Sequence, residues 1–350
     1  MREELYPIEE VCLAIGLEES KIRFLEKEFG GIFQFTEFSP IKKYFNSRQV
    51  SALQHISYLW QEKGQSIEAI KSQLHSTYAH KNKGAWIIAV TSGKGGVGKT
   101  SIATNLSIVL AQKELKTIVF DADLGLANAH VLMGISPKYG LHDLLTKDVG
   151  IDDIIAEGPA GSKLIPGGSG FFDLAEIDDH QRDFVIHEIK KISSTADVVI
   201  IDTAAGISAN VLRFLALADD VIVTATPSIT SLLDAYGVIK TMYTEQIKVP
   251  VNLLVNMARS QREAREIYNK IEQCTHQFLD WNVNYLGCIK KDLNVDRAIQ
   301  LCKPLTIAYP NSPASKHIRT VADRLAGKVA SKKQEKKQDN FSNIFFKERN

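Results

Sequence analysis

The feature that most constrains this 350-residue sequence is the run Gly93-Lys94-Gly95-Gly96-Val97-Gly98-Lys99-Thr100. It fits G-x-x-x-x-G-K-[ST], with a β-branched stretch before it and a helical pattern beginning at Ser101 after it. Glycines here let the backbone wrap around phosphates, so that successive N–H groups and the helix N-terminus point at negative charge. Lys99 is then expected to reach the β- and γ-phosphates, and Thr100 to bind Mg²⁺. The run predicts a nucleoside triphosphate site that includes Ser101.

From residue 86 onward, short apolar runs alternate with helix-length segments. The predicted strands are Trp86–Thr91, Thr117–Phe120, Val198–Ile201, Val221–Thr224 and Val251–Val255, and the predicted helices are Ser101–Gln112, Ser208–Ala218, Ser228–Gln246 and Arg259–Leu279. Continuous apolar strands between helices are typical of a parallel sheet covered on both faces. The fold class is therefore α/β, a doubly wound and mostly parallel sheet that binds its ligand at the carboxyl ends of the strands.

The chain divides by pattern into four parts. Residues 1–78 are expected to form a small helical domain, 79–85 a polar linker, 86–327 the nucleotide-binding domain and 328–350 a Lys-rich tail. A hydrophobic content of 44% and a charged content of 24% are ordinary for globular proteins. The net charge of +1 means that any nucleic-acid or membrane surface must be local.

The cysteines and the N-terminal residues indicate where in the cell the protein is expected. Four cysteines lie far apart in the sequence with no metal-ligand spacing, which predicts reduced, buried thiols. The N-terminus is acidic and does not fit a signal peptide, and no stretch approaches eighteen uncharged apolar residues. A cytoplasmic location is expected.

Two predicted strands end in aspartates, which phosphoryl transfer needs near the phosphate loop. The apolar strand Val198–Ile201 leads into Asp202, which is expected to hold Mg²⁺ through water. Asp121 and Asp123 follow the strand Thr117–Phe120. Taken singly, each aspartate could equally be a helix N-cap. Together with the phosphate loop they predict a catalytic cluster.

The run Lys94–Thr100 resembles the signature K-G-G-x-G-K-[ST] of the deviant Walker A ATPases of the MinD/ParA family. The resemblance implies an ATP hydrolase that uses ATP and Mg²⁺ and forms an ATP-sandwiched homodimer, in which Lys94 contacts the partner's phosphates. A solvated loop lysine is the plain alternative. With Lys99, Lys94 is then a candidate catalytic residue.

Three further segments resemble family motifs. Residues 121–128 resemble switch I, which implies that Asp123 orients the attacking water, Asp121 lies in the second shell of Mg²⁺ and Asn128 supports the dimer interface. Residues 203–206, ending at Gly206, resemble switch II, although Ala204 stands where the family often has Pro or Gly.

The resemblance also suggests a base site. Asn256 ends the strand Val251–Val255, where the family places an adenine-contacting Asn, and Pro310 lies in a segment, 309–315, that resembles the loop packing on the base. The N-K-x-D guanine motif is absent, which favours ATP over GTP.

Within the family, the segments 164–168 and 292–299 resemble the FlhG/YlxH branch of flagellar number regulators. That branch implies a spatial regulator with a flagellar or polar protein partner. Iron–sulfur relatives need cysteines between the switches, and none lies between Cys12 and Cys274. The alternatives are a ParA-like DNA-segregation or transcription-linked ATPase and, on the same phosphate loop, a small-molecule kinase or ligase.

Residues 1–78 resemble a MerR-type winged helix, with a helix over residues 6–11 and a turn at 15–17, a second helix over 20–28, a wing over 33–44, and residues 46–50 opening a further helix. Such modules bind DNA through basic residues on the second helix and the wing. Yet residues 1–84 hold eleven basic and eleven acidic residues. DNA affinity depends on phosphate neutralisation, so DNA binding and protein docking remain open alternatives for this domain.

The C-terminal residues 328–350 hold seven basic and three acidic residues. Phe341, Ile344 and Phe345 fall at helical spacing and predict one apolar face. A basic run leading into a short amphipathic segment suits an interfacial membrane anchor, and MinD-like proteins end in one. A single copy binds only marginally, whereas a dimer presents two copies, so attachment would be switchable. The tail thus predicts peripheral contact with the inner face of the cell membrane, and a solvated tail is the alternative.

Overall fold

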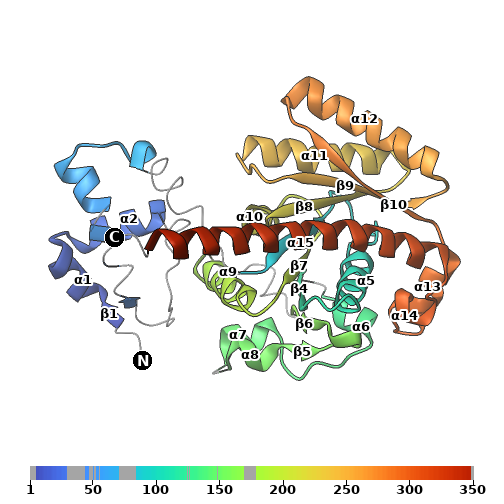
Figure 1. Ribbon diagram of the computed structural model, residues 1–350, viewed down its shortest axis with the longest axis horizontal. Helices are drawn as coiled ribbons and strands as arrows, with labels where there is room; N and C mark the ends of the chain where they lie inside the picture. Colours follow the sequence, from blue (N-terminus) through green and yellow to red (C-terminus); the bar gives the residue numbers. More distant parts are fainter. Residues whose placement is uncertain are drawn as a thin grey trace. The chain divides into compact units, whose positions relative to one another are not determined.

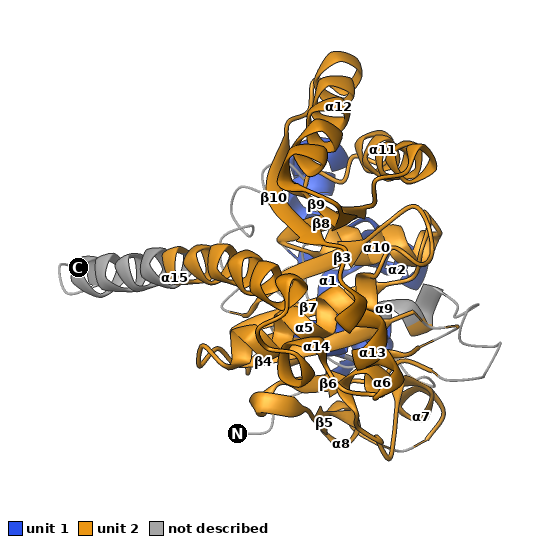
Figure 2. Ribbon diagram, turned by 90° about the vertical axis from the view of Figure 1, so that its right-hand side faces the viewer, with its two compact units in different colours: residues 1–83, 183–190 blue, residues 84–182, 191–350 orange. Residues whose placement is uncertain are grey.

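The computed structural model describes residues 5–29, 44–46, 50, 53–54, 56–70, 84–123, 125, 127–147, 149–168 and 179–347. Within these ranges, only the backbone is described at residues 5, 44, 46, 179, 180, 182, 183 and 332–347. The chain divides into two compact units, coloured in Figure 2. Unit 1 comprises residues 1–83 with 183–190, and unit 2 comprises 84–182 with 191–350. The division after Lys83 falls inside the predicted linker.

Unit 1 contains a short two-stranded sheet and helices around one apolar core. β1 (Leu5–Pro7) pairs antiparallel with β2 (Tyr44–Asn46), and the unit also contains α1 (Ile8–Ile15), α2 (Glu19–Phe29) and a π-helix (Tyr58–Glu62). Val11, Ile22 and Leu25 are fully buried in its core.

Two expectations for unit 1 are wrong at the edges of elements. Tyr6 and Pro7, predicted as the start of a helix, lie in β1, because Pro7 has extended backbone and only precedes α1. Asn46 ends β2, whereas Val50 is helical, so the expected helix starts after Asn46. The turn at Gly16 is confirmed, with φ +71 at the end of α1. The predicted wing, 33–44, lies outside the described residues except at Tyr44.

Unit 2 is built on one sheet of eight strands among the described residues, in the order β10-β9-β8-β3-β7-β4-β6-β5. All neighbours are parallel except β5 and β6. The strands are β3 (Trp86–Thr91), β4 (Thr117–Ala122), β5 (Ala156–Glu157), β6 (Lys163–Ile165), β7 (Val198–Thr203), β8 (Asp220–Ala225), β9 (Val251–Ala258) and β10 (Val283–Lys290). Since β3 lies between β7 and β8, the chain order reverses there, which is where such sheets bind ligands.

Helices cover both faces of this sheet (Figures 1 and 2). α5 (Lys99–Ala111) and α15 (Pro313–Lys347) lie on one face, and α10 (Ala209–Leu217), α11 (Ile229–Thr244) and α12 (Gln261–Leu279) lie on the other. Unit 2 also contains α6 (Ala129–Met133), α7 (Leu141–Thr146), α8 (Ile151–Ile154), a 3₁₀ turn (Pro159–Gly161), α13 (Leu293–Gln300) and α14 (Leu305–Ala308). The residues of α9 (Asp179–Ser193) are divided between the two units. The predicted doubly wound α/β fold is confirmed.

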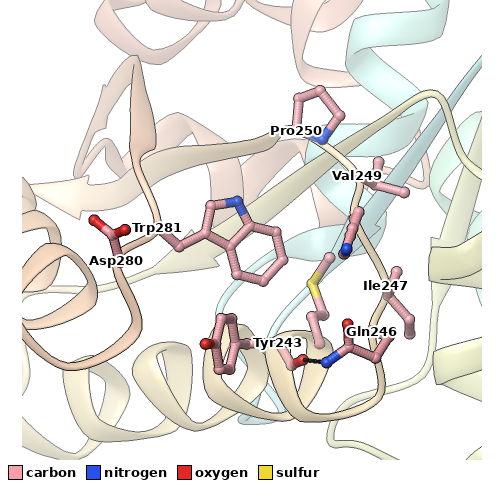
Figure 3. A pocket seen from close by; sticks show the side chains of 9 residues that line it. Tyr243, Gln246, Ile247, Val249, Pro250, Asp280 and Trp281 are labelled. Atoms are coloured by element: carbon pink, nitrogen blue, oxygen red, sulfur yellow. Dashed lines mark hydrogen bonds between the residues drawn. The ribbon is translucent and has the colours of Figure 1, made fainter.

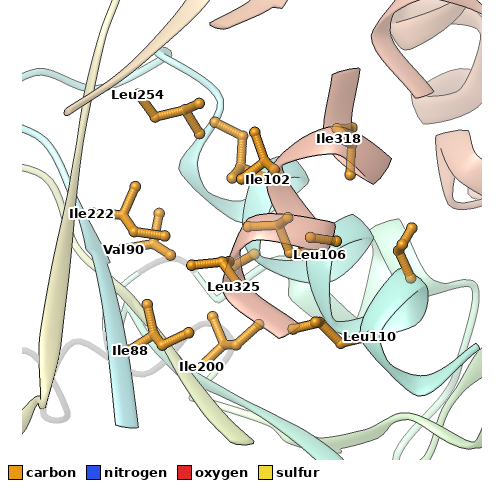
Figure 4. Close-up of a cluster of buried hydrophobic side chains, with 14 of the residues drawn as sticks. Ile88, Val90, Ile102, Leu106, Leu110, Ile200, Ile222, Leu254, Ile318 and Leu325 are labelled. Carbon is orange, nitrogen blue, oxygen red and sulfur yellow. The ribbon is translucent and has the colours of Figure 1, made fainter. Parts of the chain in front are cut away.

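The core beneath α5 and α15 holds the nucleotide-facing helix in place (Figure 4). Ile102, Leu106 and Leu110 of α5 are buried against strand side chains such as Ile88 and Ile200. α5 is buried along most of its length, including its polar residues Thr104, Asn105 and Ser107. The phosphate loop therefore leads into a helix that this core holds in place.

α15 continues without interruption through residue 328, where the tail was expected to begin. The Lys328 ammonium lies 3.0 Å from Asp220 Oδ1 of β8 and 3.2 Å from Asn252 Oδ1 of β9. This lysine is anchored to the amino-end edge of the sheet. Helical backbone reaches Lys347, but the side chains of Phe341, Ile344 and Phe345 lie outside the described part of the structure.

The expectation of buried thiols holds for one cysteine out of four. All four are free, but Cys274 and Cys302 are exposed, Cys12 is partly buried and only Cys288 is buried. Within the described residues, no helix combines the length and apolar character needed to cross a membrane.

Candidate nucleotide site

The phosphate loop follows β3 at the carboxyl end of the central strand and leads into α5. Gly96 and Gly98 have φ of +76 and +93, and Gly98 is the N-cap of α5. A Cβ at position 98 would lie 2.5 Å from Asn256 Nδ2. Position 98 thus requires glycine, both for its positive φ and because a side chain there would collide with Asn256. Gly93 is required by space alone, since a Cβ there would lie 2.4 Å from the Asp234 carbonyl oxygen of α11.

Lys99 lies beside two carboxylates, Asp202 at the end of β7 and Asp123 just after β4. Its side chain is buried, and burial lowers the pKa of its ammonium while the charges of Asp202 and Asp123 oppose that shift. Asp121 of β4 is directly paired in register with Asp202 of β7. The sheet itself therefore brings together the residues that the sequence analysis selected at separate strand ends.

Asp202 has the environment expected of a cation ligand. It is fully buried, and neither carboxylate oxygen has a hydrogen-bond partner among the described residues. Burial raises its pKa to about 8, and the charge of Asp121 adds to the rise while the charge of Lys99 opposes it. A buried carboxylate without partners is unfavourable unless a cation completes the site. Asp202 and the Thr100 hydroxyl thus fit Mg²⁺, which binds proteins through few ligands and keeps water and phosphate oxygens.

Asp121 holds the loop after β4 in place. Its Oδ2 accepts a hydrogen bond from Ala129 N at 2.9 Å, and its Oδ1 accepts one from Asp123 N at 3.3 Å. Burial raises the pKa of Asp121 to about 6, and these hydrogen bonds restrain the rise. Gly167 approaches the same loop, since a Cβ there would lie 2.6 Å from the Asp121 carbonyl oxygen. Asp121 is placed to position Asp123 rather than to face a ligand directly.

Asp123 and Asn128 mark the two ends of that loop. Asp123 is half-buried beside Lys99, and Asn128 is an exposed N-cap of α6. Leu124 and Leu126 between them lie outside the described residues. From this position Asp123 would orient water for in-line attack on a γ-phosphate, while Lys99 would neutralise charge that develops on the phosphate oxygens. Mg²⁺, when bound, supplies further charge neutralisation at the same oxygens.

Lys94 points back onto its own chain. Its Nζ donates to Thr230 Oγ1 of α11 at 3.3 Å, and its carbonyl accepts from Ser92 Oγ at 2.7 Å. The Ser92 carbonyl in turn accepts from Gly206 N at 2.9 Å, and Gly206 has φ +96. Ser92 therefore joins the phosphate loop to the switch II segment. Neither Ser92 nor Thr230 was predicted as a site residue, because no sequence motif marks either of them.

Asn256 braces the phosphate loop. Its Nδ2 donates to Val97 O at 2.8 Å, and its Oδ1 accepts from Met257 N at 2.9 Å. Both ends of its amide are thus engaged within the protein. Its contact with adenine stays a prediction.

The predicted base loop is tied to the phosphate-loop helix by Asn105. Asn105 Oδ1 accepts from Thr306 N at 2.9 Å and from Thr306 Oγ1 at 3.0 Å, and its Nδ2 donates to Ser101 O at 2.8 Å. Thr306 lies in α14, just before the exposed Pro310. Asn105 is the one amide among the Ser, Thr and apolar residues that follow Lys99 in α5, and this was the signal in the sequence that could have revealed it.

A different cavity lies at the opposite end of the strands, just before β9 and β10 (Figure 3). It has a volume of about 500 Å³ and lies between the C-terminal ends of α11 and α12, next to Pro250, which precedes β9. The rings of Tyr243 and Trp281 face each other across it with centroids 6.1 Å apart. It contains no residue predicted for the nucleotide site.

Comparison with known proteins identifies both parts of the chain. Residues 88–305 match the CobQ/CobB/MinD/ParA nucleotide binding domain, and residues 6–77 match the MerR HTH family regulatory protein. The chain is 36% identical to the antiactivator FleN of Pseudomonas aeruginosa over 239 residues, which is 68% of this chain and 85% of FleN.

Two other matches agree with this. The chain is 34% identical to the flagellum site-determining protein YlxH of Helicobacter pylori over 253 residues, which is 72% of this chain and 84% of YlxH. Among solved structures, the cell division ATPase MinD of Pyrococcus furiosus superimposes with a TM-score of 0.60 at 22% identity, covering 69% of this chain and 99% of that one. The chain therefore belongs to the CobQ/CobB/MinD/ParA family of nucleotide-binding proteins and is a MinD/ParA-type ATPase that uses ATP with Mg²⁺.

Proposed function

We propose that this protein is an ATP-driven, dimerising switch that regulates the number or placement of flagella. The observation that carries the proposal is the similarity to FleN and YlxH, which extends over 85% and 84% of those proteins and includes the nucleotide-binding domain. The useful output of such a switch is its conformational state, since slow ATP hydrolysis only resets it.

Lys94 is the residue proposed to couple ATP to dimerisation. In the single chain its ammonium is bonded only weakly, by a neutral hydroxyl at 3.3 Å. A partner's phosphates offer a much stronger, charge-assisted bond. If the Lys94 ammonium left Thr230 and bound those phosphates, formation of the dimer would depend on ATP. Asp123, half-buried beside Lys99, would then orient the attacking water and so limit the lifetime of the dimer.

The two ends of the chain are proposed to give the dimer its location and its partner. The basic tail, 328–350, would contact the inner face of the membrane through Phe341, Ile344 and Phe345, twice per dimer. Residues 6–77 would dock a flagellar or polar protein.

A second candidate rests on the match of residues 6–77 to the MerR HTH family. It is a ParA-like, transcription-linked ATPase that reads DNA through this domain. The balance of eleven basic and eleven acidic residues in 1–84 weakens this alternative, since phosphate contacts supply much of DNA affinity.

A genetic experiment tests the proposed function. In the organism that encodes this chain, deletion of the gene should change the number of flagella per cell, counted by electron microscopy. Complementation with the unmodified gene should restore the count, whereas Lys94→Ala should fail at equal protein level. Normal flagella in the deletion strain would contradict the proposal.

A biochemical experiment separates the two candidates. Co-sedimentation with anionic vesicles should require ATP and the segment 340–350. Binding to DNA but not to vesicles, unaffected by removal of that segment, would favour the second candidate.

A further inference from the structure

A second cavity, of about 360 Å³, lies beside the edge strand β10, between the first turns of α12 and the first third of α15. Because α12 and α15 cover opposite faces of the sheet, side chains from both faces meet there. Its lining residues are Gln261, Arg262, Arg265, Tyr285, Leu286, Gly287, Cys288, His317, Thr320, Val321 and Arg324. None of them belongs to the phosphate loop, the switch segments or the predicted base site.

The charge of this cavity is one-sided. Three arginines line it, and no aspartate or glutamate does. Arg262 is paired with Glu266, with Nε and Oε1 3.1 Å apart. Arg265 and Arg324 have no ion pair among the described residues, and both act electrostatically on the phenol of Tyr285. Two guanidinium groups that pair with no described carboxylate therefore line the same cavity.

His317 adds little to this charge. Its Nδ1 accepts a hydrogen bond from the Lys290 backbone N–H at 3.1 Å, and burial together with the charge of Lys290 lowers the pKa of its imidazole. The positive potential at neutral pH comes from the arginines.

The two guanidinium groups are also held in place. Arg265 lies over the Tyr285 ring at 4.3 Å, and that ring packs on Tyr268 with centroids 5.1 Å apart. Stacking fixes the plane of the guanidinium and leaves its edge, with its N–H donors, free to bind. Arg324 Nη1 donates to the Leu286 carbonyl. At Gly287, where φ is +141 and β10 bulges, a Cβ would lie 3.2 Å from Arg324 Nη1, so glycine preserves the space for this side chain.

We propose that this cavity binds a phosphate group through Arg265 and Arg324. Planar guanidinium groups bind phosphate oxygens in pairs, and a dianion would neutralise the two charges that the protein leaves unpaired. The volume exceeds what inorganic phosphate needs, so the group can be carried by a small metabolite or by the headgroup of an anionic phospholipid. The site is independent of the proposed flagellar function and of the phosphate loop.

The first test uses inorganic phosphate on the full-length protein with its nucleotide site saturated by Mg²⁺ and ADP, so that the phosphate loop is already filled. Titration calorimetry at constant ionic strength should show saturable binding. Arg265→Ala and Arg324→Ala should each weaken phosphate binding at least tenfold. Arg265→Lys should also weaken it, because lysine keeps the charge but lacks the planar, paired N–H donors of arginine. Lys270→Ala, on the same helix outside the cavity, should leave it unchanged.

ADP affinity and thermal unfolding of each variant verify folding. Gly287→Ala, which crowds Arg324 without removing charge, serves as a second variant and should also weaken binding. Absence of saturable phosphate binding to the ADP-loaded wild type, or equal binding by the Arg265→Ala, Arg324→Ala double variant, would overturn the proposal. The arginines would then only shield the edge of β10.

A second arm distinguishes the sources of the phosphate. Glycerol phosphate in solution is compared with vesicles of phosphatidylglycerol, using protein that ends at residue 331 so that the tail cannot contribute. Tight binding to vesicles that depends on Arg265 and Arg324 would assign a lipid headgroup. Binding of glycerol phosphate alone would assign a soluble metabolite.

Discussion

At the residue scale, Asp202 illustrates how the fold raises the energy of a single carboxylate to prepare a cation site. Its pKa is raised to about 8, mainly by burial, whereas in an unfolded chain it is about 3.9. Between these values the folded protein keeps a proton that the unfolded chain has lost, so the free energy of unfolding falls as pH rises from about 4 to about 8. Binding of Mg²⁺ displaces this proton, so affinity for Mg²⁺–ADP should increase over the same range.

Asp202→Asn should remove this pH dependence. Without Mg²⁺ or nucleotide, the variant should be more stable than the wild type at pH 8, and the two should be similar near pH 4. Each kcal/mol corresponds to about 2–4 °C in Tm for a domain of this size. Calorimetric scans in EDTA from pH 4 to 9 measure this. Parallel pH profiles for both proteins would mean that Asp202 is ionised in the folded state.

Gly98 gives a second prediction at this scale. Gly98→Ala should destabilise the protein by about 1–3 kcal/mol, because φ is +93 and the new methyl group would meet the Asn256 amide at 2.5 Å. Gly95→Ala is the matched control, since a Cβ there meets nothing within 4 Å and φ is not positive. Urea unfolding without nucleotide measures both. Equal loss in the two variants would contradict the role of Asn256 as a brace.

At the scale of elements, strands with a continuous apolar pattern could be predicted from the sequence, whereas short or irregular strands could not. Trp86–Thr91 is predicted without error and becomes β3, because it is buried on both faces. β10 was missed, because Asn284 and a bulge at Gly287 interrupt its apolar pattern and its position at the sheet edge relaxes the need for one. β6, with three residues, is too short to show any period.

Lys328 yields a prediction about α15. Lys328→Met should lower the Tm by a few degrees, about 1 kcal/mol, because Asp220 loses its ammonium partner while Asn252 still bonds to it. The pair lies at the amino ends of the strands, so ATP turnover should not change. Lys316→Met, at an exposed position of the same helix, is the control and should leave the Tm unchanged. An unaltered Tm for Lys328→Met would mean that Lys328 does not stabilise the fold and behaves as part of the tail.

At the scale of the whole molecule, the candidate site was largely predictable, because a phosphate loop and strand-end aspartates are local patterns that a parallel sheet must bring together. Asp121 and Asp202 become neighbours only through the register of β4 and β7, which the alternation of strands and helices implies. Contacts such as that between Lys94 and Thr230 span more than a hundred residues and depend on side-chain geometry, so no pattern predicts them.

The central claim is that ATP drives this chain to dimerise through Lys94. The most direct measurement is the mass in solution, by light scattering, of Asp123→Ala protein with saturating Mg²⁺ and ATP, compared with ADP. We expect twice the monomer mass with ATP, the monomer with ADP, and a monomer in both cases when Lys94→Ala is added. A monomer for Asp123→Ala under saturating Mg²⁺ and ATP, or a dimer that persists without Lys94, would contradict the claim.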